Sequence, residues 1–242
     1  MGQKVKPNAY RIGISLPWQN RWFYHKNLRY FLEEDFHIRR YLREKVLQAG
    51  IASIEIERTS GAIRVIVRAA RPGLIIGRGG KGIEELRAGL LETIKKCRRG
   101  AKIGVVPARA SGSGGTAVLN LNLNIEELKR SDVSAAVVAQ QVAFDIEKRL
   151  PFRRVMRRTL ETTMQNREAQ GAKIRLSGRL NGAEISRNEW LAKGRMPLQT
   201  LRANVDYGEA TAFNTYGTIG VKIWIYKGDV FEKKNDRESA RM

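Results

Sequence analysis

The order of hydrophobic and polar residues predicts regular helices and strands in the first part of the chain. Between residues 27 and 49, apolar side chains recur at helical spacing, and Gly50 ends the pattern. Residues 53–58 and 62–68 alternate between apolar and polar side chains, which indicates two strands. Thr59-Ser60-Gly61 between them is typical of a hairpin turn. The sequence therefore predicts a helix followed by a β-hairpin.

A glycine-rich turn that carries positive charge follows the hairpin. It contains Gly77, Arg78, Gly79, Gly80 and Lys81, and apolar residues recur behind it at helical spacing. Glycines have no Cβ and can adopt positive φ, so the N–H groups of such a turn can approach a phosphodiester closely. The two cations and the N-terminus of the next helix attract the same anion. We therefore predict that these five residues bind the backbone of RNA.

Two other phosphate-binding motifs fit this turn less well. A P-loop needs a glycine five residues before Gly80 and a serine or threonine after Lys81, but these positions hold Ile75 and Gly82. The glycines do match the dinucleotide fingerprint G-x-G-x-x-G. That motif, however, needs an acidic residue about 20 positions later, where residues 95–102 carry only positive charges. The favoured interpretation is the G-x-x-G loop of a KH domain, which the preceding helix and two strands support.

Further elements are predicted up to residue 150. Residues 119–125 alternate and predict a third strand, and an apolar stripe over residues 131–150 predicts a helix with Ser131 as its N-cap. The segment from about 108 to 118 is rich in glycine and serine and is expected to form a flexible loop. Pro151 fits the first turn of a new helix and marks the predicted domain boundary.

The helix that begins at Pro151 carries four arginines on one side. Arg153, Arg154, Arg157 and Arg158 fall within a sector of about 140° of the helix. Like charges on one face repel each other, and a solvated face usually mixes both signs. We therefore predict that this face binds nucleic acid.

The rest of the chain predicts a second domain that is rich in strands. Three strands are predicted, at residues 173–180, 200–206 and 217–226. Residues 178–184 indicate a turn into a short helix near Trp190. Residues 231–242 mix both signs of charge and are predicted to be a disordered tail.

The first 26 residues form a basic extension in which aromatic residues are interleaved. Its cations are Lys4, Lys6, Arg11 and Arg21, and its aromatic residues include Trp18 and Trp22. Phosphate pairing and base stacking on such residues are typical of extensions that contact RNA. The aromatic side chains can equally pack on the first domain, and the sequence does not decide between these two roles.

The composition limits what the chain can bind. Its 45 lysines and arginines against 24 acidic residues give a formal charge of +21, which indicates a polyanionic partner. With one cysteine, Cys97, and two histidines, His25 and His37, we expect neither a disulfide nor a metal centre, and no cofactor. No apolar run approaches the roughly 20 residues of a membrane span, and the N-terminus lacks the apolar core of a signal peptide. A cytoplasmic location without membrane contact is therefore expected.

Five segments, spread over nearly the whole chain, carry a resemblance to a known family. They are residues 2–5, 75–80, 152–158, 177–185 and 216–225. Their motifs are similar to those of the bacterial-type small-subunit ribosomal proteins of the S-three family. The resemblance implies an α+β fold, with a type II KH domain over residues 27–150 and a second α+β domain with a mostly antiparallel sheet over residues 151–230. The Gly/Ser-rich segment extends the loop before the third KH strand.

The resemblance also implies a structural role in the head of the small ribosomal subunit. The partners would be small-subunit ribosomal RNA, mRNA at its entry channel, and neighbouring head and entry-channel proteins. In the family, basic residues that match Arg153, Arg154 and Arg157 are associated with unwinding of structured mRNA. The chain has no recognisable nucleoside triphosphate site, so we expect neither an enzyme nor a small-molecule substrate.

Two alternative functions remain to be weighed. A free nuclease or helicase would need a nucleotide site or clustered carboxylates for metal ions, whereas Glu84-Glu85 and Glu126-Glu127 are adjacent pairs among cations. A KH protein that acts in transcription or RNA decay is the other alternative. The matches outside the KH domain weigh against it.

Overall fold

A computed structural model describes residues 4–22, 28–59, 62–100, 120–129 and 132–231. The chain forms two compact units, of which one contains Gln19–Lys129 and the other combines Met1–Trp18 with Arg130–Met242. The predicted loop at 108–118, the N-cap Ser131 and residues 232–242 of the predicted tail lie outside the described residues. Each unit has its own hydrophobic core.

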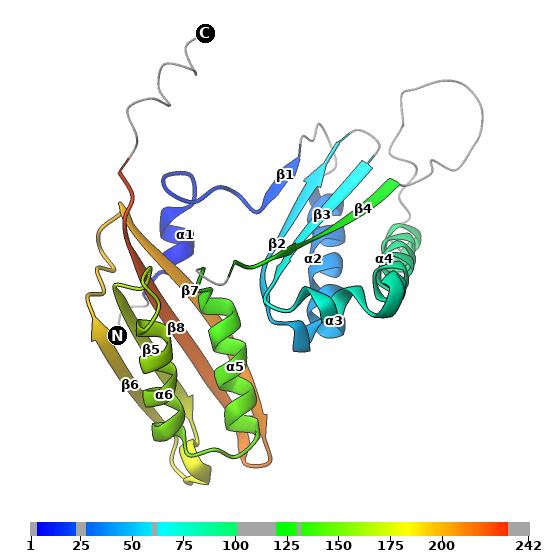
Figure 1. Cartoon of the computed structure of the whole chain (residues 1–242). Coiled ribbons are helices and arrows are strands. Elements are labelled where there is room, and N and C mark those ends of the chain that lie inside the picture. Colours follow the sequence, from blue (N-terminus) through cyan, green and yellow to red (C-terminus); the bar gives the residue numbers. More distant parts are fainter. Residues whose placement is uncertain (1–3, 23–27, 60–61, 101–119, 130–131, 232–242) are drawn as a thin grey trace, which may run out of the picture. The chain divides into compact units, whose positions relative to one another are not determined.

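The unit of residues 19–129 packs helices against a four-stranded sheet (Figure 1). Its elements are β1 (Asn20–Trp22), α2 (Leu28–Lys45), η1 (Leu47–Ala49), β2 (Ile51–Arg58), β3 (Ala62–Ala69), α3 (Pro72–Ile76), η2 (Arg78–Gly80), α4 (Lys81–Gly100) and β4 (Asn120–Glu127). The strand order is β1-β2-β3-β4, and only the β2–β3 pair is antiparallel. Ile38 of α2 and Leu90 of α4 bury their side chains against the apolar face that Ile56 and Val65 supply.

The predicted order of helix, two strands, G-x-x-G turn, helix and strand is confirmed in this unit. Gly50 ends the first helical region with φ 68°, a conformation that glycine adopts without a steric cost. Two short elements were not predicted, α3 and β1. Each has five residues or fewer, which is too short to show a full helical or strand period.

The other unit packs two helices on one face of an antiparallel sheet (Figure 1). Its elements are α1 (Pro7–Arg11), α5 (Ala135–Glu147), α6 (Phe152–Met164), β5 (Gly171–Gly178), η3 (Leu180–Gly182), β6 (Arg187–Gly194), β7 (Ala203–Asn214) and β8 (Gly217–Asp229). The strand order is β6-β5-β8-β7. Val142 of α5 and Met156 of α6 are buried with Ile174 and Ile223 of the sheet. None of the helices in the described part of the chain is long and apolar enough to cross a membrane.

The position of α5 differs from the predicted domain boundary at Pro151. The helix packs on β7 and β8, so it belongs to the unit of the antiparallel sheet. Its N-terminus lies so close to β7 that a Cβ on Gly208 would be 2.3 Å from the carbonyl oxygen of Ala135. Asp206 caps the helix, since its Oδ2 accepts a hydrogen bond from the Ala135 N–H at 2.8 Å. An apolar stripe shows that a helix is buried, but it does not show which sheet buries it.

Strand β6 replaces the short helix that was predicted near Trp190. This strand pairs with β5 over eight residues at the edge of the sheet. Nearly all its side chains are exposed on both faces, so the alternation that reveals a half-buried strand is missing from its sequence.

Helix α1 is attached to this second unit by the buried side chain of Arg11. The guanidinium has no exposed surface and donates to the carbonyl oxygens of Ala203 at 2.6 Å, Thr200 at 2.9 Å and Leu198 at 3.2 Å. It also donates to the carbonyl oxygens of Pro7 and Pro197. Burial lowers the pKa of Arg11 from its ordinary value. The N-terminal segment is thus an integral part of the unit, and the chain enters residues 19–129 only after it.

Arg11→Ala is expected to destabilise this unit by about 3 kcal/mol, because it leaves several buried carbonyl oxygens without a donor. Urea unfolding, with hydrogen exchange of residues 195–203 as the local readout, measures the effect. Arg21→Ala is the matched control: Arg21 is exposed and lies 3.7 Å from Glu57, so a change within about 0.5 kcal/mol is expected. Equal stability of the two variants would contradict the structural role of Arg11.

Candidate nucleic-acid interfaces

The G-x-x-G turn joins α3 to α4 through glycines in the left-handed region. Gly77 has φ 69°, Gly79 has φ 63° and Gly80 has φ 80°. Gly77 donates its N–H to the carbonyl oxygen of Gly73 at 3.1 Å, which closes α3. Residues other than glycine rarely adopt these positive φ values, which explains why glycine occupies these three positions of the turn. The backbone of Gly77 and Gly79 is exposed to solvent.

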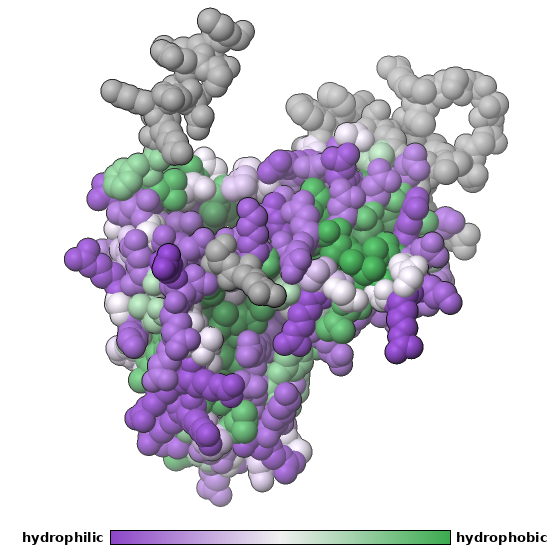
Figure 2. Space-filling view, viewed as in Figure 1, coloured by the Kyte–Doolittle hydropathy of each residue, from purple (hydrophilic) through white to green (hydrophobic). Residues whose placement is uncertain are grey.

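Around the turn lie two cations and several apolar side chains. Arg78 and Lys81 are exposed, and their side chains make no hydrogen bond or ion pair within the described residues. Leu74 is 60% exposed and Ile76 is 38% exposed in the short helix just before the turn. Figure 2 shows a hydrophobic patch on this unit in the region of α3, α4 and β4. Cations beside exposed apolar surface can bind a phosphate and the base attached to it. The two cations are evident from the sequence, whereas this apolar surface was not predicted.

The four arginines predicted to bind nucleic acid share one exposed side of α6. This arginine face consists of Arg153, Arg154, Arg157 and Arg158, all of them exposed. The other side of the helix is buried, because Val155, Met156 and Leu160 belong to the core. Arg153 lies 3.5 Å from Glu189. The side chains of the other three arginines form no hydrogen bond or ion pair within the part of the chain that the structure describes.

The basic residues of the N-terminal extension have different environments. Arg11 was predicted to bind RNA, but its buried guanidinium is fully occupied by backbone carbonyls. Lys6 pairs with Glu209, and Arg21 lies near Glu57. Lys4 is exposed. The extension therefore offers fewer free cations than its sequence indicates. The aromatic residues divide in the same way, since Trp22 donates to a buried carboxylate at 3.2 Å while Trp18 is 66% exposed.

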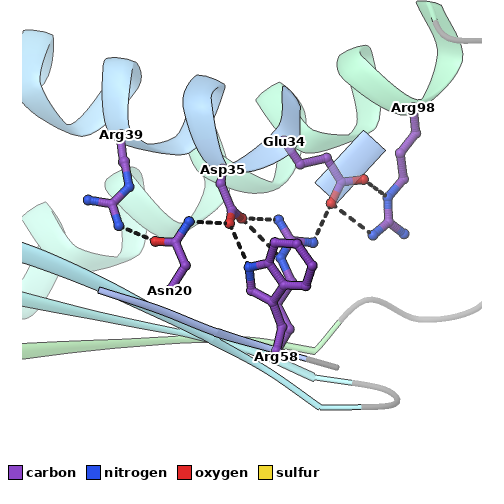
Figure 3. Close-up of polar contacts among 7 residues, drawn as sticks. Asn20, Glu34, Asp35, Arg39, Arg58 and Arg98 are labelled. Carbon is purple, nitrogen blue, oxygen red and sulfur yellow. Dashed lines mark hydrogen bonds and ion pairs between the residues drawn. The ribbon is translucent and has the colours of Figure 1, made fainter. Parts of the chain in front are cut away.

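A network of ion pairs at two buried carboxylates neutralises further arginines (Figure 3). Glu34 and Asp35 of α2 are nearly inaccessible to solvent. Arg58 of β2 donates to Asp35 at 3.0 Å and to Glu34 at 2.6 Å, and Arg98 of α4 donates to Glu34 at 2.7 Å. Asn20 of β1 donates to Asp35 at 2.8 Å. The network joins α2, α4 and two strands, so both arginines support the fold of the unit, and the buried side chain of Arg58 is not available to RNA.

The pKa of Asp35 is set by two opposing effects. Burial raises the pKa of Asp35, whereas the charge and hydrogen bonds of Arg58 oppose that rise. The ionised carboxylate therefore depends on Arg58 as its principal partner.

One group of potential metal ligands lies between α2 and α4. Ligand atoms of Glu33, His37 and Cys97 are all within 4.8 Å of one another, and sequence reasoning did not bring these residues together. Burial and the neighbouring carboxylates raise the pKa of the Cys97 thiol, so the thiol keeps its proton. Arg29 and Lys96 line the same cavity and repel a cation. We therefore assign no metal to this group.

Comparison with known proteins gives two family matches that cover most of the chain. Residues 37–132 match the family described as KH domain. Residues 142–225 match the family described as Ribosomal protein S3, C-terminal domain. The first match falls largely on the unit of residues 19–129 and the second on the unit of the antiparallel sheet.

Full-length relatives show the same similarity. A protein of Acidobacterium capsulatum is 40% identical over 99% of this chain and 97% of its own length. One of Syntrophomonas wolfei is 42% identical over 98% and 94%, and one of Caldicellulosiruptor saccharolyticus is 45% identical over 97% and 96%. All three are named small ribosomal subunit protein uS3.

Gly82→Ala is expected to destabilise the turn by about 1–3 kcal/mol, because its Cβ would lie 2.5 Å from the carbonyl oxygen of Ile75. Urea unfolding and hydrogen exchange over residues 72–86 measure this effect. Gly73→Ala is the control, since a Cβ there meets nothing within 4 Å. If Gly82→Ala is as stable as Gly73→Ala, the close packing of α3 on α4 is not what holds the turn.

Arg58→Ala is expected to cost about 3–5 kcal/mol at neutral pH, because it leaves the buried Asp35 carboxylate without its principal partner. Losing Arg58 raises the pKa of Asp35 further above its ordinary value of 3.8. A carboxyl group whose pKa is higher in the folded chain binds a proton on folding, so the deficit should shrink as the pH falls through the folded pKa.

Urea unfolding at about pH 7 and about pH 4.5, resolved on peptides of β2 and β3 by pulsed hydrogen exchange, tests this pH dependence. Arg64→Ala on β3 is the control, because Arg64 is an exposed arginine that lies 3.6 Å from Glu57. It should cost less than about 1 kcal/mol at either pH. An Arg58→Ala deficit that stays constant or grows at the lower pH would contradict the assignment to Asp35.

Proposed function

Because the chain belongs to the family of small ribosomal subunit protein uS3, whose members are structural proteins and not enzymes, we propose that it binds small-subunit ribosomal RNA and contacts mRNA at its entry channel. Its place is in the head of the subunit, beside neighbouring head and entry-channel proteins, in the cytoplasm. The chain is a ribosomal protein over its full length, since the relatives match both units.

The arginine face of α6 is the observation that best supports a contact with mRNA. Three of its four guanidiniums are exposed and form no ion pair within the described residues. Placing like charges side by side costs free energy unless an anion lies against them. A nucleic-acid strand supplies anions at regular spacing, and the planar guanidinium can bind a phosphate through two hydrogen bonds.

The arginine face would assist unwinding by holding separated strands, and it would not hydrolyse a nucleotide. Its cations bind the phosphates of a strand that has separated from its partner and hold that strand. Re-formation of the hairpin is then opposed while translocation supplies the work. The rigid core side of α6, with Met156 and Leu160 buried, keeps the arginines in position against the moving strand.

The G-x-x-G turn and the basic extension are proposed to bind ribosomal RNA. The turn combines exposed glycine backbone with Arg78, Lys81 and the apolar Leu74. Lys4, Lys6 and Arg21 are the exposed cations that the extension adds, although Lys6 and Arg21 lie beside carboxylates, whereas Arg11 is excluded from this role by its burial. The role rests on the exposed charge and on the family.

A regulatory KH protein that acts away from the ribosome is the less favoured alternative. Such a protein would need the KH match alone. This chain shares at least 94% of the length of each of the three relatives described above, including the second unit. That extent favours the ribosomal function.

Replacing Arg153, Arg154 and Arg157 by alanine is expected to spare assembly of the subunit and to slow translation through mRNA hairpins. Each lost phosphate contact weakens the hold on the separated strand. Translation rates on messages with and without a stable hairpin, compared in a reconstituted system, measure the effect.

The matched control removes three exposed cations from the other unit: Arg40→Ala, Arg43→Ala and Lys45→Ala on α2. Sedimentation shows whether each variant enters the small subunit. If the arginine-face variant translates structured and unstructured messages at the same rate as the control, the entry-channel role is wrong. If the unaltered chain sediments as free protein, the ribosomal assignment itself fails.

A further inference from the structure

The second unit has another basic surface, on the side of its sheet that faces away from α5 and α6 (Figure 1). Strand residues alternate between the two sides, and the core takes Ile174, Val221 and Ile223. Their neighbours in sequence therefore face the other way. We call this surface the open face. Its central members on β5, β6, β7 and β8 are Lys173, Arg175, Trp190, Tyr207, Glu209, Lys222 and Trp224.

The positive charges of the open face lie in adjacent strands. Arg175 pairs in register with Lys222 of β8, and Lys173 is two residues away on β5. The one carboxylate at these positions is Glu209, and it is already neutralised by Lys6 of the N-terminal segment. Lys6 and the Glu209 partner Tyr207 also lower the pKa of that carboxyl group, so it stays ionised and paired. Lys222 lies opposite Glu209 in register and also helps to lower the pKa of that carboxyl group, whereas Lys173 and Arg175 form no ion pair within the described residues.

Aromatic rings are interleaved with these cations. Trp190 lies across from Arg175 in register and is 60% exposed. The Nζ of Lys173 lies 4.7 Å from the centroid of the Trp190 ring and 5.8 Å from that of Trp224. Phe213, further along β7 on the same side, is 71% exposed. The rings are thus held by the sheet and by the lysine, and two of them present apolar surface to solvent.

Within the described residues, apolar side chains of the unit cover one end of the open face. There Met196 and Leu198 pack on Ala203, Val205 and Tyr226. The cover ends before Trp190 and Phe213, which remain the exposed aromatic residues of the face. A partner that completes this surface must therefore offer flat apolar groups and negative charge together.

We propose that the open face binds single-stranded RNA, with bases stacked on Trp190 and Phe213 and phosphates on Lys173, Arg175 and Lys222. Unpaired bases have flat faces, and phosphates follow them at a fixed spacing, which matches rings set among cations on a sheet. A protein partner fits less well, because lysine is depleted from the centres of protein interfaces. This surface lies on the opposite side of the sheet from the arginine face and does not depend on the entry-channel function.

Binding of a labelled single-stranded RNA of about 12 nucleotides to the purified full chain tests the proposal. The measurement uses a background of Arg78→Ala, Arg154→Ala and Arg157→Ala, so that the G-x-x-G turn and the arginine face contribute little. Adding Trp190→Ala should weaken binding about tenfold, the effect of losing one stacked base. Phe36→Ala is the matched control, since Phe36 is 61% exposed on α2 and belongs to no surface proposed to bind RNA, and it should leave the affinity unchanged.

A charge variant gives an independent readout. Arg175→Ala with Lys222→Ala should reduce the slope of log affinity against log salt by about 1.4, the value for two lost phosphate contacts on a single strand. Photocrosslinking with mass spectrometry should place RNA on the peptides of β5, β6 and β8.

Binding by the Trp190→Ala variant as tight as that of Phe36→Ala, with no change of salt slope in the charge variant, would overturn the proposal and assign the face to a protein neighbour. Trp190 is exposed on an edge strand, so its loss should leave the fold intact, which hydrogen exchange of β5 checks. This failure is distinct from failure of the entry-channel role, which is measured on ribosomes through other residues.

Discussion

The buried guanidinium of Arg11 is the interaction on which the division of the chain depends. A charge without a carboxylate partner is costly to bury, and here five backbone carbonyls replace the water that it loses. One acceptor is Pro7 of α1, and the other four lie in residues 197–203. The N-terminal segment must therefore fold together with this distant part of the chain. Residues 19–129 are then an insertion that the main chain enters and leaves once, with its own core.

The distribution of paired and unpaired charge explains how a chain of +21 folds and still binds a polyanion. Inside the unit of residues 19–129, Arg58 and Arg98 are neutralised by Glu34 and Asp35, and they join helices to strands. The cations without carboxylates are gathered on surfaces that the cores hold rigid, such as the arginine face. Attraction to RNA is thereby separated from the interactions that stabilise each unit.

How much the sequence could predict depended on whether a signal was local. The alternation of residues 53–58 and 62–68 and the glycines at 77–80 define their own structure, and these elements were predicted correctly. Arg11 looked like a surface cation because four of its five acceptors are about 190 residues away. Strand β6 and the docking of α5 were missed for the same reason, since an edge strand and a choice between two sheets depend on tertiary contacts. The arginine face could be predicted from the sequence because helical geometry alone brings its members together.

The attachment of α1 also sets an order of events during synthesis. Arg11 leaves the peptidyl transfer site 192 residues before Ala203, whose carbonyl oxygen it binds. At about 5–20 residues per second, the N-terminal segment waits roughly 10–40 s for its acceptors. Residues 19–129 are complete well before that time, so the inserted unit can fold first while the ends of the other unit are still apart. The last strands to be made, β7 and β8, then close the fold by bringing in the first residues of the chain.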